Sequence, residues 1–139
     1  MLDQSTVAIV RESYALALSR RPCLMQDFYL FLLARHPDLE PLFPRSLARQ
    51  ADKFSGALQL LLSYANAPDD LSRALRRLGR DHQGYGARPE HYPAVIDALV
   101  ETLAIQLGRD WTESYETAWR GLLGFVGAEM LAGAANAAA

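Results

Sequence analysis

Prolines and glycines divide this chain into segments whose apolar residues recur every three or four positions, the period of an amphipathic helix. The dividing residues are Pro22, Pro37, Pro68, Pro89 and Gly108. No stretch alternates apolar and polar residues over a length typical of a strand. The sequence therefore predicts an all-α fold with about six main helices.

Caps and helix breakers predict where these helices begin and end. The first helix is expected to begin after a cap formed by Asp3 or Ser5 and to end before Pro22. Three prolines in HPDLEPLFP restrict that segment to short helical turns. The later helices are expected over about 22–35, over about 47–64, from Pro68 or Asp69 to shortly after His82, from Pro89 to Gly108, and from Asp110 or Thr112 to about Met130.

Length and charge limit the number of domains and the class of partner. A chain of 139 residues suits one core, and we expect one domain over residues 1–133 with a frayed alanine-rich tail over residues 134–139. The net charge of −2 favours neither nucleic acid nor an anionic membrane as a partner. Asp3, Arg11 and Glu12 interrupt the N-terminal apolar residues, so this segment matches neither a signal peptide nor a membrane span. We therefore expect a cytoplasmic protein.

Several kinds of site are disfavoured by what the sequence lacks. It contains no G-x-S-x-G elbow, no phosphate-binding glycine loop and no H-E-x-x-H segment. Its carboxylates are spread along the polar faces, without an inward pair for acid–base chemistry. The single cysteine, Cys23, cannot form an internal disulfide, and we expect it to be a small buried apolar residue.

One histidine lies where the helical pattern predicts a leucine. The apolar stripe of its helix consists of Leu71, Leu75, Leu78 and then His82. A lone histidine on an apolar face is more often a hydrogen-bonded core residue than a metal ligand. His36 and His91 are expected at the surface, and no histidine pair has the spacing of a helical zinc site. A single histidine is sufficient only when a cofactor supplies the other ligands, as haem does with its four nitrogens.

Three segments together resemble the globins, especially bacterial single-domain globins and the haem domain of flavohaemoglobins. They are FYLFLLARHPDLEPLF, LGRDHQGYGARPEHYPAV and WTESYETAW, and the resemblance extends from Met1 to about Met130. It implies a globin fold, with short helical turns beside the main helices around a haem pocket. It also implies haem b as the cofactor and His82 as the proximal ligand to its iron.

The resemblance further implies which residues contact the haem. Pro37 shapes the corner beside the cofactor, Phe43 packs flat against the porphyrin, and Lys53 is the expected partner of a propionate. The remaining expected cofactor contacts are Phe54, Leu78, Tyr85, Tyr92 and Val95.

On the distal side, the resemblance implies Tyr29 and Gln50 as ligand-binding residues. Both side chains can donate a hydrogen bond, which stabilises dioxygen more than neutral carbon monoxide because dioxygen acquires partial negative charge at the iron. Tyr29 could instead be an ordinary core aromatic residue. A register shifted by three residues would put Lys53 in place of Gln50. We prefer Gln50 because Phe54 then begins the inward stripe of its helix.

The proximal side departs from the flavohaemoglobin pattern. That family places a glutamate in the last helix as a hydrogen-bond partner of the proximal histidine, whereas counting from Trp119 puts Ala134 there. Glu129 lies more than a turn earlier, and a one-turn shift would bring it closer. We expect the His82 imidazole to donate to a backbone carbonyl instead, that of Leu78.

The resemblance implies reversible binding of dioxygen, with nitric oxide and carbon monoxide as further ligands, in the oxygen-binding or oxygen-transport class of bacterial globins. Nitric oxide dioxygenase activity would require a separate reductase as a partner, so enzymatic activity stays open. The alternative is a haem-free sensor or interaction domain in which His82 is a core residue. Tyr29 and Gln50 opposite His82 argue against it, because a haem-free core would have to satisfy all three polar groups internally.

Overall fold

A computed structural model describes residues 3–43, 46–64 and 66–138, and its account of side chains ends at residue 135. Within these ranges all regular structure is helical, which confirms the predicted all-α class. In chain order the helices are α1 (Gln4–Arg20), α2 (Leu24–Arg35), the 3-10 helix η1 (Pro37–Leu42), α3 (Leu47–Ser63), α4 (Pro68–Gly84), α5 (His91–Leu107), the 3-10 helix η2 (Gly108–Asp110) and α6 (Glu113–Ala138).

Side-chain caps determine where the first and last long helices begin. Asp3 accepts a hydrogen bond from the Thr6 amide at 2.7 Å, so the cap of α1 is Asp3 and not Ser5. The hydroxyl oxygen of Thr112 accepts one from the Tyr115 amide at 3.1 Å, so Thr112 caps α6. Each cap satisfies one of the free amides at a helix start.

Two predicted helix starts were wrong by two residues. Pro22 and Pro89 lie in turns that precede α2 and α5, outside the helices themselves. In each turn the amide two residues after the proline, that of Leu24 or His91, donates to the carbonyl of the residue before the proline at 3.0 Å. A proline at the second position of a turn favours this arrangement. Cys23 lies in the first turn and is exposed, so the prediction that it is buried was also wrong.

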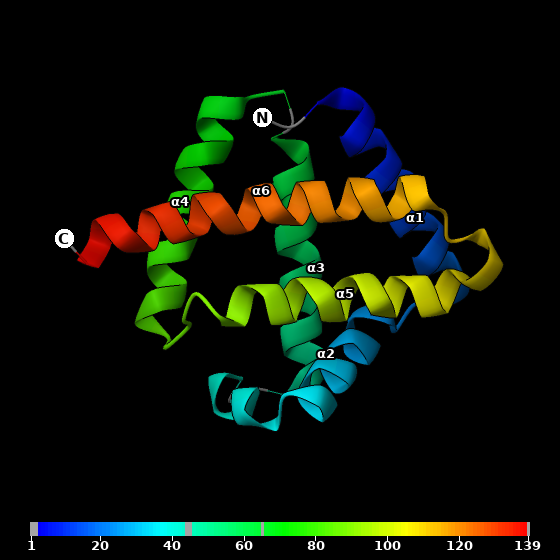
Figure 1. The fold of residues 1–139 in the computed structure, drawn as a ribbon, viewed down its shortest axis with the longest axis horizontal. Coiled ribbons are helices and arrows are strands. Elements are labelled where there is room, and N and C mark those ends of the chain that lie inside the picture. Colours follow the sequence, from blue (N-terminus) through cyan, green and yellow to red (C-terminus); the bar gives the residue numbers. More distant parts are fainter. Residues whose placement is uncertain (1–2, 44–45, 65, 139) are drawn as a thin grey trace.

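The helices surround two apolar cores. In Figure 1, α5 and α6 run side by side in opposite directions, α4 crosses α6 towards its C-terminal end, and α3 passes behind the pair. The main core is formed by α1, α2, α3, α5 and α6, and its largest fully buried side chains are Trp119 and Phe28. A smaller core joins Leu71 and Leu75 of α4 to Met130 of α6. Helix α4 thus contributes its buried leucines to the smaller core only, whereas most of the molecule surrounds the main core.

The last helix is also the longest, with 26 residues. Its backbone is helical to Ala138, so fraying of residues 134–139 stays a prediction. Neither α6 nor any other helix within the described ranges has the combination of length and apolar character needed to cross a membrane.

Candidate functional site

The imidazole of His82 is oriented by its own helix. It lies near the end of α4 and is half-buried, and its Nδ1 atom is 2.8 Å from the carbonyl oxygen of Leu78, as predicted. Because a carbonyl oxygen can only accept, Nδ1 is the donor and bears the proton of the neutral ring. The lone pair of Nε2 is then free to bind a metal, and the bond to Leu78 fixes the direction of the ring.

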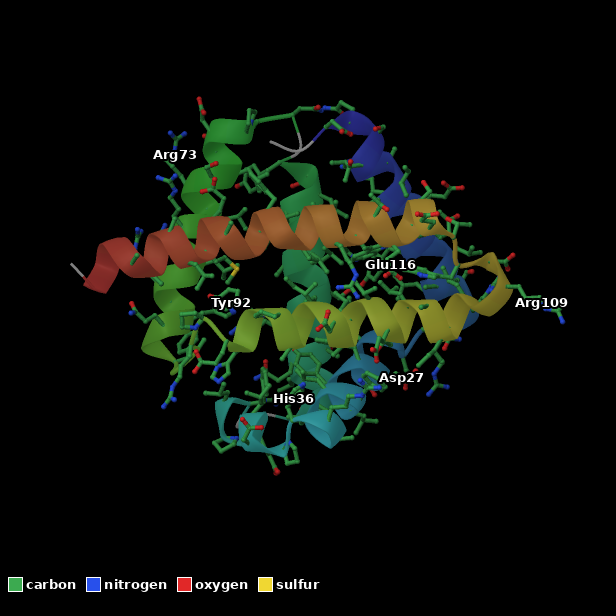
Figure 2. The ribbon with its side chains drawn as sticks, in the orientation of Figure 1. Asp27, His36, Arg73, Tyr92, Arg109 and Glu116 are labelled. Carbon is green, nitrogen blue, oxygen red and sulfur yellow. The ribbon has the colours of Figure 1, made fainter. Side chains whose placement is uncertain are left out.

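Large apolar side chains on both sides of the boundary between the two cores are only half-buried. Phe43, Phe54 and Val95 border the main core, whereas Leu78 and Tyr92 border the smaller one. Figure 2 shows Tyr92 near the start of α5, between α5 and α6. Among the described residues, α4 packs closely on α6 and has no comparable contact with α2, α3 or α5. An apolar group bound on the inner side of α4, the side that faces the main core, would cover these side chains.

Tyr29 is a buried residue whose hydroxyl has no described hydrogen-bond partner. Its side chain is 4% exposed and packs against the rings of Phe43 and Phe54, with centroids 5.2 and 6.1 Å away. None of the described residues forms a hydrogen bond with its hydroxyl, and burial raises the pKa of Tyr29 to about 12. No side-chain oxygen of the described residues is fully buried without a partner, so this hydroxyl keeps some access to solvent. The Tyr29 hydroxyl is therefore available to a ligand.

The structure distinguishes Gln50 from Lys53 by exposure. Gln50 is half-buried on α3, and its side chain makes no hydrogen bond to the described residues. Lys53 is exposed, and its Nζ atom lies 5.9 Å from the centroid of the Tyr85 ring. Tyr85 is 65% exposed, and its ring centroid lies 6.2 Å from that of His82. Lys53 and Tyr85 thus link α3 to the end of α4 at the outer edge of the site.

Glu129 forms an ion pair with Arg76 and not with the His82 imidazole. Its Oε2 atom lies 3.0 Å from Nε of Arg76, and only 19% of the Glu129 side chain is exposed. Ala134, the position that counting from Trp119 assigned to a proximal carboxylate, is half-buried on the same helix. The Nδ1 proton of His82 therefore goes to the Leu78 carbonyl, while Glu129 neutralises Arg76.

Two functional candidates escaped sequence analysis, and both are glycines inside helices. A Cβ atom at Gly79 of α4 would overlap the backbone carbonyl of Met130. One at Gly133 of α6 would overlap the backbone carbonyl of Arg76. A glycine within a helix costs about 1 kcal/mol relative to alanine, which is the one signal the sequence offered. Gly56, Gly84, Gly121 and Gly124 are also helical and approach nothing, so this signal could not single out the two close contacts.

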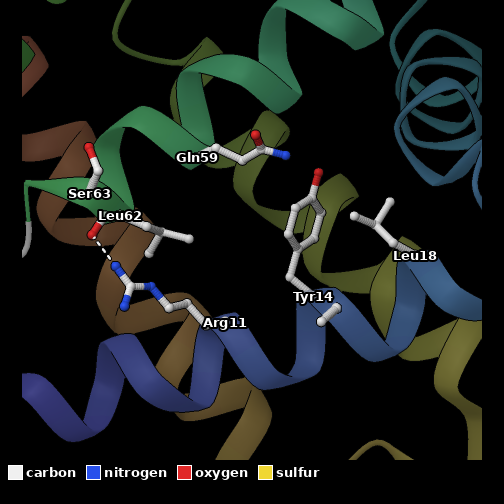
Figure 3. Close-up of a pocket in the computed structure, with 7 residues that line it drawn as sticks. Arg11, Tyr14, Leu18, Gln59, Leu62 and Ser63 are labelled. Atoms are coloured by element: carbon white, nitrogen blue, oxygen red, sulfur yellow. Dashed lines mark hydrogen bonds between the residues drawn. The ribbon is translucent and has the colours of Figure 1, made fainter.

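The open groove drawn in Figure 3 is separate from this site. It has a volume of about 320 Å³ and lies between α1 and α3. A hydrogen bond of 2.6 Å from the Arg11 guanidinium to the Leu62 carbonyl closes one end. Its lining consists of Arg11, Tyr14, Ala15, Leu18, Gln59, Leu62 and Ser63. No predicted site residue contributes to it, so the groove is not part of the site around His82.

Burial of Tyr29 predicts a loss of stability at alkaline pH. The unfolded chain releases the tyrosine proton near pH 10, whereas the folded protein holds it until about pH 12, so stability falls as pH rises between these values. The stabilisation lost from this group is about 1 kcal/mol near pH 11. Urea unfolding of the apoprotein at pH 8 and near pH 11 should show a smaller loss for Tyr29→Phe than for the parent. Equal losses in the two proteins would contradict the prediction.

The comparisons with known proteins agree on the fold. The sequence profile of the family described as Globin matches residues 26–130. One similar solved structure is an engineered carbene transferase, made from a provisionally named nitric oxide dioxygenase of Rhodothermus marinus. It is 28% identical to this chain with a TM-score of 0.79, and the match covers 99% of this chain and 96% of that chain. A protein of Pseudomonas aeruginosa described as structurally highly homologous to a human haemoglobin has 27% identity and a TM-score of 0.81, with 92% and 97% covered.

Among curated proteins, the chain is similar to two flavohaemoproteins. It is 28% identical to that of Rhizobium meliloti over 96% of this chain and to that of Vibrio cholerae over 86% of it. The aligned part is 34% and 31% of those relatives' lengths, so the chain spans about a third of each.

Proposed function

The chain belongs to the globin family, and from this premise we propose that it binds haem b on the inner side of α4 and binds dioxygen reversibly there. His82 is the proposed ligand to the iron. The observation that supports this most strongly is the hydrogen bond from Nδ1 of His82 to the Leu78 carbonyl, because it leaves Nε2 free and directed. Haem supplies the four porphyrin nitrogens and an iron that binds diatomic gases and exchanges electrons.

The half-buried apolar side chains are the proposed walls for the cofactor. Phe43, Phe54 and Val95 would cover it from the main core, and Leu78 and Tyr92 from the smaller core. Burying apolar porphyrin surface against them stabilises the complex in proportion to the area removed from water. The protein's own contribution is therefore a dry, apolar site with one nitrogen ligand.

On the opposite side of the pocket, Tyr29 is the proposed donor to bound gases. A tyrosine hydroxyl is protonated at neutral pH, and burial raises the pKa of Tyr29 further, to about 12. It can therefore donate to dioxygen, which draws negative charge, more strongly than to carbon monoxide. Gln50 is the proposed second donor. Its partial burial beside the exposed Lys53 supports this register over the one shifted by three residues.

Conversion of nitric oxide to nitrate is a further proposed activity of the same pocket. Nitric oxide, dioxygen and one electron together give nitrate, so continued turnover requires a one-electron donor. The chain spans only a third of its flavohaemoprotein relatives, and we propose a separate reductase as that donor. A cytoplasmic location is part of this proposal.

The test of the proposed function uses the haem-loaded, reduced protein. We expect dioxygen and carbon monoxide each to change the visible spectrum, and the dioxygen spectrum to revert when argon replaces the gas. Nitric oxide added in the presence of dioxygen should be consumed to about one equivalent per protein and then persist, until a reductase and its electron source are added. A protein whose spectrum responds to neither gas would contradict the proposal.

The contact between Lys53 and Tyr85 is expected to slow the loss of haem relative to variants that lack it. An exposed cation–π contact contributes about 0.5–1 kcal/mol, so Lys53→Met and Tyr85→Leu should each speed haem transfer to an excess of apomyoglobin by roughly two- to five-fold. Lys53→Arg keeps the charge and is the matched control. If Lys53 acted only on a haem propionate, Tyr85→Leu would leave the rate unchanged, and the predicted role of the contact would be wrong.

A further inference from the structure

The backbones of α4 and α6 touch at two neighbouring points. A side chain at Gly79 would overlap the Met130 carbonyl, and one at Gly133 would overlap the Arg76 carbonyl. The two points are three residues apart on each helix, so they form one continuous crossing. Even alanine cannot be accommodated there unless the helices separate, because both obstacles are backbone atoms.

An ion pair lies beside this crossing. Arg76, whose carbonyl faces Gly133, also directs its guanidinium to Glu129 of α6 at 3.0 Å. Glu129 is the more buried partner, with 19% of its side chain exposed against 48% for Arg76. Figure 2 shows Arg73, one turn earlier on α4, pointing outward from the molecule, so not every arginine of this helix is turned to α6.

The crossing lies immediately before the histidine. Gly79 follows Leu78, whose carbonyl holds Nδ1 of His82, and His82 itself comes less than one turn after Gly79. Within the described residues, α4 has no comparable packing against α2, α3 or α5. The location of the imidazole relative to the rest of the pocket is therefore determined mainly by how α4 sits on α6.

We infer that the α4–α6 crossing is a positioning device for the metal ligand, with Gly79, Gly133 and the Arg76–Glu129 pair as positioning residues for His82. In this assignment Glu129 acts on the imidazole through Arg76 and the helix, and not as its hydrogen-bond acceptor. The inference rests on the proposed function, because it concerns the ligand to haem iron.

The experiment compares the iron–histidine stretching band of the reduced, ligand-free, haem-loaded protein by resonance Raman spectroscopy. Gly133→Ala is expected to shift or broaden this band. It should also speed haem loss by roughly ten-fold or more, the usual effect of disturbing the groups that orient a metal ligand. Gly124→Ala on the same helix is the matched control, because a Cβ atom there would meet nothing within 4 Å. It should leave the band and the rate unchanged.

Substitutions in the ion pair decide the inference even if Gly133→Ala does not fold. Arg76→Gln and Glu129→Gln should give the same shift, the double variant should add little, and Arg76→Lys should restore the parent band. Pairs that act as one unit show this non-additivity. A shift with Glu129→Gln but not with Arg76→Gln would show that Glu129 acts on His82 directly and would overturn the inference.

Two other outcomes separate the inference from the proposed function. The inference alone would be overturned if the parent protein holds haem and gives the band, but Gly133→Ala and both ion-pair variants only lower the melting temperature. A parent protein without an iron–histidine band would overturn the proposed function and the inference with it.

Discussion

Replacing His82 with glycine is expected to weaken haem binding by roughly 100-fold or more, since even residues that only orient a metal ligand change affinity by 10- to 100-fold. The substitution removes the one nitrogen that the protein offers to the iron, together with the hydrogen bond to the Leu78 carbonyl. It also leaves a space the size of an imidazole. Added imidazole should enter that space and partly restore the spectrum of the parent protein.

The matched control for this substitution is His36→Ala. His36 was expected at the surface but is half-buried, like His82. It lies between α2 and η1, and its imidazole makes no hydrogen bond to the described residues. Haem titrations followed by visible absorption should therefore give the parent affinity for His36→Ala and a much weaker one for His82→Gly. If His82→Gly retained the parent spectrum and affinity without imidazole, the assignment of the ligand would be wrong.

The second large effect is expected at Tyr29. Tyr29→Phe removes a hydroxyl that no described residue satisfies, while the ring can keep its packing against Phe43 and Phe54. The loss of a hydrogen bond worth about 1.5 kcal/mol corresponds to dioxygen dissociation that is roughly ten-fold faster. Carbon monoxide dissociation should change much less, because that ligand gains little from a donor. Flash photolysis or ligand replacement in a stopped-flow instrument measures both rates.

Tyr14→Phe is the control for Tyr29→Phe. Tyr14 is 5% exposed, but its hydroxyl is bonded to Ser55 at 2.7 Å, so its removal should alter stability without altering dioxygen dissociation. Equal acceleration of dioxygen and carbon monoxide by Tyr29→Phe would indicate altered access or packing and would contradict a donor role. Gln50→Leu should reproduce the selective effect on dioxygen, whereas Lys53→Leu would do so only if the register were shifted by three residues.

Much of the fold could be predicted from local signals. The apolar stripe through Leu71, Leu75, Leu78 and His82 fixed both the helix and the inward direction of the histidine, because a helical period leaves little choice of face. The bond between His82 and Leu78 follows from the same geometry, since residues four apart adjoin on a helix. The helix starts predicted at Pro22 and Pro89 were wrong, because a proline suits the second position of a turn as well as the first turn of a helix.

The parts that could not be predicted depend on contacts between distant segments. Nothing in the sequence distinguishes Arg76 from the other arginines of its helix, and only the crossing of α4 and α6 brings it to Glu129. Counting along α6 could place Ala134 and Glu129 relative to Trp119, but it could not say where α4 would cross that helix. Gly79 and Gly133 set this crossing, and a glycine in a sequence does not reveal which backbone it approaches.

His82 is proposed to hold haem in a single pocket on the inner side of α4. A titration of the purified apoprotein with haemin, followed by visible absorption and run alongside His82→Gly, tests this directly. The parent protein should give a spectrum distinct from free haemin that saturates sharply at one equivalent, and the variant a weak, imidazole-dependent spectrum. Absorbance that rises as for free haemin without saturation, or saturation that is identical in both proteins, would show that His82 does not hold haem in such a pocket.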